Sequence, residues 1–247
     1  MGLIDETLRV ALSDFYYFRR NLLLLLATSM VTPLLYMLAF GYGLGQGITM
    51  EGVDYIAFMI PGVISLTTLT STFDTVSHKI MIQKRFYESF DEMLLCPISK
   101  GAIIFGRALL GVVKGMMCGT ILVVMGMLFT PDLHVSAGLF GMMLLSCFVF
   151  SLLGVAAGVV VEDLVHMSLF TTFVILPMTF LCGTMFSLDA LPGAIRWAID
   201  ALPLSQTSGC MRALALQWEF PWMSLVVLVA YGAAFYALAH WALTRGE

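Results

Sequence analysis

The sequence predicts an all-α integral membrane protein with six transmembrane helices. Two observations carry this prediction, the composition and the length of the apolar runs. Of the 247 residues, 60% are hydrophobic and only 11% are charged, whereas a soluble domain has about 25% charged residues. A globule so poor in charge would expose large apolar patches and aggregate. Soluble enzymes, nucleic-acid-binding proteins and disordered chains are therefore excluded.

The six spans are defined by apolar runs bounded by charge, Pro or Gly-rich sequence. A bilayer core about 30 Å thick needs roughly 20 helical residues, and β-barrel strands would be much shorter, about 10 residues, with alternating polarity. The runs that satisfy the helical length are 21–44, 55–75, 102–129, 135–161, 167–186 and 222–243. Residues 21–247 are therefore expected to form one six-span transmembrane domain.

Residues 1–20 predict an amphipathic helix before the first span. Charged residues such as Glu6, Arg9 and Asp14 point away from its apolar face. That face is formed by Ile4, Leu8, Ala11, Leu12 and Phe15. Such a helix lies in the membrane interface; a surface anchor and a mechanical element are both open readings.

The positions of the basic residues predict the orientation. Lys and Arg concentrate on the cytoplasmic side of bacterial membrane proteins. Six spans place both termini on one side, together with Arg9, Arg19, Arg20, Lys79, Lys84, Arg85, Lys100 and Arg245. The opposite side holds only Arg196 and Arg212. Both termini are expected in the cytoplasm.

The longest cytoplasmic loop, 76–101, predicts a short amphipathic helix that Pro97 would end. Its apolar face combines Phe86, Phe90, Met93 and Leu94, and its acidic face Glu88, Asp91 and Glu92. The pattern suits a docking element held between two spans; a solvated surface turn is the alternative.

The outer segment 187–221 is too long and too apolar for a free turn. It contains two helix-like pieces, 191–201 and 205–216, separated by Pro203. We expect it to form a re-entrant helical hairpin between spans five and six, because non-helical backbone at membrane depth must be buried in protein.

Inside the spans, Lys114 lies near the middle of the third. A cation there is costly unless it is paired or hydrated. In a functional role, Lys114 would line a polar path for an anionic group. In a structural role, it would snorkel or pair with Asp74. Gly111, Gly115 and Gly119 form overlapping GxxxG spacings. Such faces let helices approach closely, either within one chain or in a dimer.

Motifs for chemistry are absent from the sequence. No lysine stands in a P-loop pattern, and no HExxH or GxSxG sequence occurs. The chain is therefore expected to be no enzyme, to carry no cofactor or metal of its own, and to take its energy from a partner.

Two stretches resemble ABC-2 type transporter permeases. Residues 84–97 and the following helix are similar to the family's cytoplasmic loop, with Arg85, Asp91, Met93, Leu94 and Pro97 filling its pattern and Glu88, Ser89 and Phe90 replacing Gly-Thr-Leu. Residues 176–214 are similar to the end of span five and the outer hairpin, through Pro192, Pro203, Leu204 and Arg212.

The resemblance implies a homodimeric export permease of the bacterial inner membrane with two separate ABC ATPase subunits, which bind ATP and Mg²⁺. Its substrate would be a lipid-linked or amphiphilic molecule, either an oligosaccharide- or polysaccharide-lipid or a hydrophobic drug; the lipo-oligosaccharide and nodulation-factor branch is most similar. The implied coupling helix comprises Arg85, Glu88, Ser89, Phe90, Asp91, Glu92, Met93, Leu94 and Pro97, and the candidate substrate path comprises Lys114, Arg196 and Arg212.

Three alternatives stay open on the residues alone. The first is a six-helix channel that works without an ATPase, and the second is a proton-coupled carrier. The third is a membrane scaffold or an enzyme with an unrecognised site. Nucleic acid is not expected as a partner, because the twelve Lys and Arg residues are scattered.

Overall fold

The computed structural model describes residues 3–44, 47, 49–87, 90, 92–93, 96, 98–130, 133–161, 163–181, 183 and 192–245. Within these residues the protein is almost entirely helical. Its elements are α1 (Leu3–Arg20), α2 (Leu22–Tyr36), the π-helix η1 (Met37–Leu44), β1 (Thr49–Met50), β2 (Val53–Asp54), α3 (Tyr55–Arg85), α5 (Lys100–Phe129), α6 (Ala137–Val160), α7 (Leu164–Phe170), the π-helix η2 (Thr171–Ile175), α8 (Leu176–Leu181), α9 (Gly193–Asp200), α10 (Pro203–Ala215) and α11 (Trp222–Arg245).

The six predicted spans are confirmed. Six helical stretches of the described chain are long and apolar enough to cross a membrane: 22–40, α3, α5, α6, 164–181 and α11. The fifth span is a continuous run of α7, η2 and α8, and its π-turns directly precede Pro177. A π-bulge accommodates a disrupted hydrogen-bond ladder, and a proline disrupts this ladder because it lacks an N–H, so Pro177 accounts for the irregularity.

Helix α3 is longer than the sequence predicted. Its apolar run ends near Thr75, but the helix continues to Arg85. The intervening segment contains neither Pro nor Gly, so nothing in it stops helical hydrogen bonding. At about 1.5 Å per residue α3 is roughly 46 Å long, which exceeds a bilayer core of about 30 Å. The expected loop 76–101 therefore begins as a helical extension of span two.

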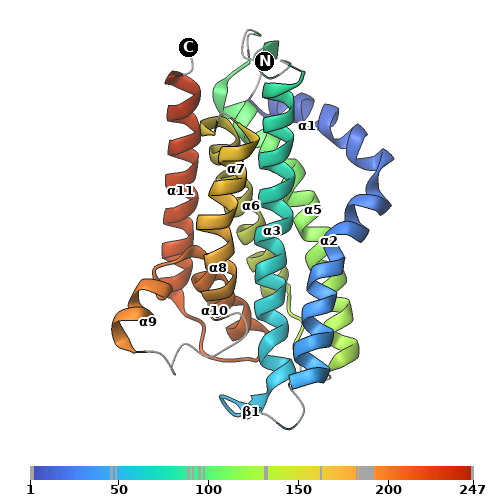
Figure 1. Cartoon of the computed structure of the whole chain (residues 1–247), viewed down its shortest axis with the longest axis vertical. Helices are drawn as coiled ribbons and strands as arrows, with labels where there is room; N and C mark the ends of the chain where they lie inside the picture. The colour runs from blue at the N-terminus through green and yellow to red at the C-terminus, as the bar shows by residue number, and fades with distance from the viewer. Residues whose placement is uncertain are drawn as a thin grey trace.

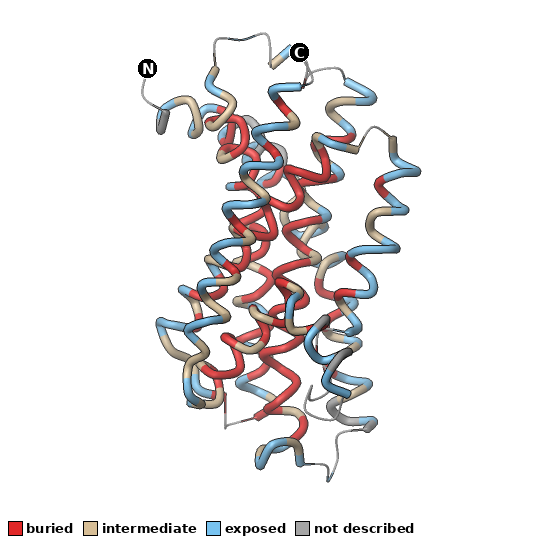
Figure 2. The backbone as a smooth tube through the Cα atoms, turned by 90° about the vertical axis from the view of Figure 1, so that its left-hand side faces the viewer, coloured by how far each residue is buried: buried red, intermediate tan, exposed pale blue. Residues whose placement is uncertain are grey.

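Helices α3 and α6 form the centre of the bundle. Their apolar windows are 89% and 78% buried, against 17% or less in the first, fifth and sixth spans, and Figure 2 shows the buried residues following the central helices. A Cβ on Gly111 would lie 2.3 Å from Ser151 Oγ, and one on Gly115 would lie 2.4 Å from Thr72 Cγ2. The GxxxG face of α5 thus packs within the chain, against α3 and α6.

The two ends of the bundle carry different structures. Both chain termini and α1 lie at one end, here called the termini end, while the β1–β2 hairpin, α9 and α10 lie at the other, here called the hairpin end (Figure 1). The two helical pieces predicted after span five are present as α9 and α10. Pro203 starts α10, where its missing N–H breaks no helical bond.

Helix α1 packs on the bundle and also exposes an apolar side. Val10 and Phe18 are buried, and a Cβ on Gly106 of α5 would lie only 2.8 Å from Val10 Cβ. Leu12 and Tyr16 are 62% and 78% exposed. The predicted amphipathic helix is therefore present, and its location in the membrane interface stays a prediction.

Candidate functional site

A cavity of about 330 Å³ lies between α2, α3, α5 and the fifth span. Its polar lining comes from four segments far apart in the sequence: Thr28, Ser29, Thr32 and Tyr36; Thr70, Ser71 and Asp74; Lys114; and Thr171 and Thr179. Residues four apart share one helical face, and this spacing places Thr28, Thr32 and Tyr36 together on α2 and Thr70 with Asp74 on α3. The cavity therefore gathers hydroxyl and charged groups from four segments of the bundle.

Lys114 is the basic side chain of this cavity. It is only 7% exposed, and its Nζ donates a hydrogen bond of 2.9 Å to Thr75 Oγ1 on α3. The residue lies fourteen positions into α5, which is roughly 21 Å from the start of the helix and hence at membrane depth. Asp74 lines the same cavity and is exposed. Lys114 thus faces a carboxylate as well as a hydroxyl.

Six of the hydroxyl groups around the cavity donate to their own helices. Thr28 bonds the carbonyl of Leu24 at 3.0 Å, and Thr70 bonds the carbonyl of Leu66 at 3.0 Å. The same pattern holds for Ser29, Ser71, Thr171 and Thr179. A hydroxyl has one hydrogen and two lone pairs, so these groups present acceptors to the cavity.

The exposed residues that line the cavity are both polar and apolar, since Thr28, Thr32 and Asp74 are exposed as well. Leu176 and Phe180 of α8 line it and are 51% and 52% exposed, and Val31 and Leu35 of α2 are exposed nearby along the chain. Polar groups and exposed apolar side chains that line one cavity suit an amphiphilic molecule.

The segment predicted to dock a partner lies at the termini end, between α3 and α5. Phe90 is 2% exposed and packs in a cluster with Ile80, Ile103 and Ile104. Glu92 is exposed, and Met93 Sδ accepts a hydrogen bond of 3.5 Å from the buried Arg107. The segment is thus anchored through apolar side chains and presents at least one carboxylate outward.

Phe86, predicted on the apolar face of the loop helix, and Arg85, predicted in the coupling helix, lie at the end of α3. Phe86 is 64% exposed, because α3 extends to Arg85 and Phe86 follows its last turn. Arg85 lies 3.7 Å from Asp163, measured from Nε to Oδ1, and so faces the turn between α6 and α7. Glu88, Ser89, Asp91, Leu94 and Pro97 lie outside the described residues.

Helix α1 contacts the start of α5 close to this segment. Glu6 Oε2 accepts hydrogen bonds from the backbone N–H and the hydroxyl of Ser99, at 3.1 and 2.9 Å. These bonds lower the pKa of the Glu6 carboxyl, because they favour its charged form. The contact connects the N-terminal helix to the residue that precedes α5.

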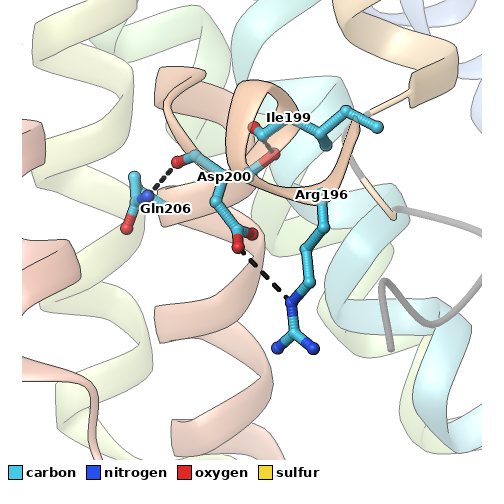
Figure 3. Close-up of polar contacts among 5 residues, drawn as sticks. Arg196, Ile199, Asp200 and Gln206 are labelled. Atoms are coloured by element: carbon cyan, nitrogen blue, oxygen red, sulfur yellow. Dashed lines mark hydrogen bonds and ion pairs between the residues drawn. The ribbon is translucent and has the colours of Figure 1, made fainter. Parts of the chain in front are cut away.

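The other two residues of the candidate path do not reach the cavity. Arg196 is exposed on α9 and pairs with Asp200 at 3.6 Å, while Gln206 and Ser205 of α10 donate to the carbonyls of Asp200 and Ile199 (Figure 3). Arg196 therefore forms an ion pair within α9, next to the residues through which α9 contacts α10.

Arg212 is a buried residue at the hairpin end. Its Nε donates to the carbonyl of Phe58 at 3.2 Å, its Nη2 donates to the carbonyl of Gly183, and its guanidinium lies 3.9 Å from the centre of the Phe58 ring. It joins α10 to the start of α3 and to the end of the fifth span. Of the three path residues, only Lys114 lines the cavity.

Sequence reasoning missed most of the cavity. The hydroxyl residues were not singled out, although the spacing of Thr28, Thr32 and Tyr36 on an apolar span is a usable signal. Their convergence with Asp74 and Thr179 depends on how four helices pack. Within the described residues, no three His, Cys, Asp or Glu side chains are grouped closely enough to hold a metal ion.

Comparison with known proteins agrees with this architecture. The chain is 30% identical over 238 residues to the inner membrane transport permease YadH of Escherichia coli K12, which covers 95% of this chain and 93% of the relative. It is 27% identical over 191 residues to nodulation protein J of Rhizobium meliloti, covering 76% and 72%, and 24% identical over 200 residues to nodulation protein J of Neorhizobium galegae, covering 80% and 76%.

The six apolar helices and the inner-membrane relative identify a multi-pass protein of the inner membrane. Residues 10–216 match the family model described as ABC-2 type transporter. This range includes the two stretches, 84–97 and 176–214, on which the sequence resemblance rested. The chain belongs to the ABC-2 type transporter family.

Proposed function

We propose that the chain is the permease subunit of an ATP-driven exporter, with both termini in the cytoplasm. The chain would form a homodimer, and two separate ABC ATPase subunits would bind ATP and Mg²⁺ at the termini end. The cargo would be a lipid-linked or amphiphilic molecule. The match of residues 10–216 to a transporter family supports this class of function.

The observation that carries the proposal is the polar cavity on a weakly buried side of the bundle. Asp74, Thr28 and Thr32 are exposed, yet they lie on membrane-spanning helices, where an uncovered carboxylate would cost several kcal/mol against lipid. A second copy that covers α2 and α8 would remove these groups from lipid. It would also enclose a polar route between the two subunits.

Coupling to the ATPases would run through the segment around Phe90. A partner that docks on Glu92 and the neighbouring Asp91 would push on a segment that is anchored to α3 and α5 through Phe90. Movement of this segment would change the packing of α3 and α5, which both contribute to the lining of the cavity. This scheme requires two states whose free energies depend on the nucleotide.

The test is purification of the tagged chain from its native membrane, followed by reconstitution with the ABC ATPase that accompanies it. The expected result is a stoichiometric complex whose ATP hydrolysis is stimulated by amphiphilic substrate and is lost when Asp91 and Glu92 are both changed to Lys. Glu219→Lys, an exposed acid at the hairpin end, is the matched control and should leave hydrolysis unchanged. Consistent failure of an ATPase to co-purify would favour a channel or a proton-coupled carrier.

A further inference from the structure

We propose that the cavity between α2, α3, α5 and the fifth span binds a zwitterion, a group that carries a primary ammonium and an acidic oxygen group a few bonds apart. Ethanolamine phosphate, the headgroup of phosphatidylethanolamine, has this chemistry. The inference goes beyond the proposed function, because it assigns a ligand to the cavity whether or not that ligand is the cargo. It follows from the charges of the cavity and from the hydrogen-bonding state of its hydroxyl groups.

The two charges of the cavity do not neutralise each other directly. Lys114 is 7% exposed, and one of the three hydrogens of its ammonium is bonded to Thr75. Thr75 follows Asp74 in α3, so both charges face the same space from neighbouring positions. Among the described residues, however, the Asp74 carboxylate accepts no hydrogen bond and forms no ion pair with Lys114. The cavity therefore holds one positive and one negative charge, each open to a ligand.

A ligand with both charges satisfies this pair. An anion would be attracted by Lys114 and repelled by Asp74, and a cation would meet the reverse, at a dielectric where Coulomb energies are large. An uncharged ligand would leave both charges without a counter-charge. A zwitterion can place its ammonium at Asp74 and its acidic group at Lys114, so that both interactions are favourable and the net charge of the site stays zero.

The hydroxyl groups of the lining fit the two ends of a zwitterion. Thr32 and Tyr36 form no side-chain hydrogen bond within the described part of the chain, so their hydroxyls can join Lys114 in donating to an acidic oxygen. The remaining hydroxyls have given their hydrogen to a carbonyl of their own helix and offer only oxygens. With Asp74 they form an acceptor-rich lining for an ammonium, which brings three N–H donors. These acceptors are Thr28, Ser29, Thr70, Ser71, Thr171 and Thr179.

The acceptor-rich lining also predicts which ammonium binds. A primary ammonium donates hydrogen bonds, whereas the trimethylammonium of choline has no N–H. Phosphatidylethanolamine should therefore bind more tightly than phosphatidylcholine, although both are zwitterions. Phosphatidylglycerol carries the phosphate without an ammonium and would leave Asp74 unmatched. The cavity volume of about 330 Å³ is at the lower end of the range for ligand sites, which suits a group of headgroup size.

The experiment measures lipid binding to the full, delipidated chain in detergent by native mass spectrometry. The three lipids carry identical acyl chains and are titrated separately. We expect phosphatidylethanolamine to bind the wild type about tenfold more tightly than either of the other two, the value of one hydrogen bond to a charged group. Equal affinities for the three lipids, or tightest binding of phosphatidylglycerol, overturn the proposal on the wild type alone, without recourse to a variant.

Two variants test the two charges separately. Asp74→Asn and Lys114→Met should each lower the affinity for phosphatidylethanolamine about tenfold. In Asp74→Asn the remaining Lys114 should also reverse the preference, so that phosphatidylglycerol now binds more tightly than phosphatidylethanolamine. Equal weakening of all three lipids by Asp74→Asn would give this residue a purely structural role and overturn the site. Thr120→Val on α5 is the control, since this hydroxyl bonds its own helix at Met116 outside the cavity; its affinities should equal those of the wild type.

Soluble phosphoethanolamine distinguishes the two sources of the zwitterion. Displacement of bound phosphatidylethanolamine by excess phosphoethanolamine would assign a free solute to the cavity, and retention of the lipid would assign a membrane headgroup; both results support the zwitterion site. The binding requires neither ATP nor an ATPase. Its failure is therefore distinguishable from failure of the proposed function, which is measured by ATP hydrolysis in the reconstituted complex.

Discussion

The ammonium of Lys114 and the hydroxyl of Thr75 lie 2.9 Å apart and join the middle of α5 to α3. Thr75 in turn donates to the carbonyl of Ser71, so the hydroxyl oxygen is free to accept from Lys114. The cation is therefore held by a neutral group and sits beside the Asp74 carboxylate in the cavity. A substitution of Lys114 can therefore show whether this residue serves transport or stability.

Lys114→Met is expected to reduce transport without destabilising the fold. A cation at membrane depth carries a desolvation cost that an apolar side chain of similar length does not, and its partner Thr75 keeps its own bond to the carbonyl of Ser71, so the apparent melting temperature in detergent should stay close to that of the wild type. Transport should fall roughly tenfold or more, which is the value of a lost charged hydrogen bond. Melting curves and vesicle transport check the two halves. A melting temperature lowered by several degrees, with transport intact, would show that Lys114 is structural.

Gly115→Val is expected to destabilise the bundle. A Cβ at this position already approaches Thr72 Cγ2 and Cys147 Sγ at 2.4 and 2.7 Å, and overpacking of this kind costs about 1–3 kcal/mol. The measurement is thermal unfolding in detergent. Gly141→Val on α6 is the control, because no atom lies within 4 Å of a Cβ placed there. Equal melting temperatures for the two variants would contradict the internal packing of this face.

The number of spans could be predicted from sequence, and the use of their polar residues could not. Span length depends on local apolarity, so all six were found, and α3 was misjudged only where its helix outruns its apolar run at Thr75. The GxxxG spacing on α5 predicted close approach, but the choice of α3 and α6 as partners depends on tertiary packing. The cavity is still harder to predict from the sequence, since Thr28, Thr70 and Thr179 come together only when the helices that line it pack against each other.

Arg212→Lys is expected to be strongly destabilising. The guanidinium bonds two carbonyls and covers the Phe58 ring, and an ammonium cannot reproduce this planar fork. Loss of a partner for two buried carbonyls costs about 3 kcal/mol. Arg196→Lys changes an exposed pair with Asp200, whose contribution is about 0–1 kcal/mol. Thermal unfolding should separate the variants clearly, and a similar small effect for both would contradict the structural role of Arg212.

The contact between Glu6 and Ser99 is expected to weaken in acid. Because the hydrogen bonds lower the pKa of Glu6 in the folded state, the contact contributes stability above the unfolded pKa and loses it as the pH falls through the lower folded pKa. Hydrogen exchange of α1, corrected for intrinsic rates, should show protection at pH 6 that decreases below about pH 4. Glu6→Gln should lower protection at pH 6, whereas Asp5→Asn should behave like wild type. Superimposable profiles for wild type and Glu6→Gln would rule the contact out as the cause.

Phe90→Ala is expected to uncouple the ATPase while leaving membrane insertion intact. Phe90 is 2% exposed and fixes the segment between α3 and α5 to the cluster that contains Ile80 and Ile104. Truncation of a buried Phe costs about 3–5 kcal/mol locally, which is enough to release a short segment without unfolding spans held by their own packing. Phe86→Ala is the matched control, since its ring is 64% exposed. Stimulated ATP hydrolysis by the reconstituted complex should be lost in Phe90→Ala and kept in Phe86→Ala. Loss of stimulated hydrolysis in Phe86→Ala but not in Phe90→Ala would mean that the exposed Phe86, and not the buried Phe90, transmits movement between the ATPase and the spans.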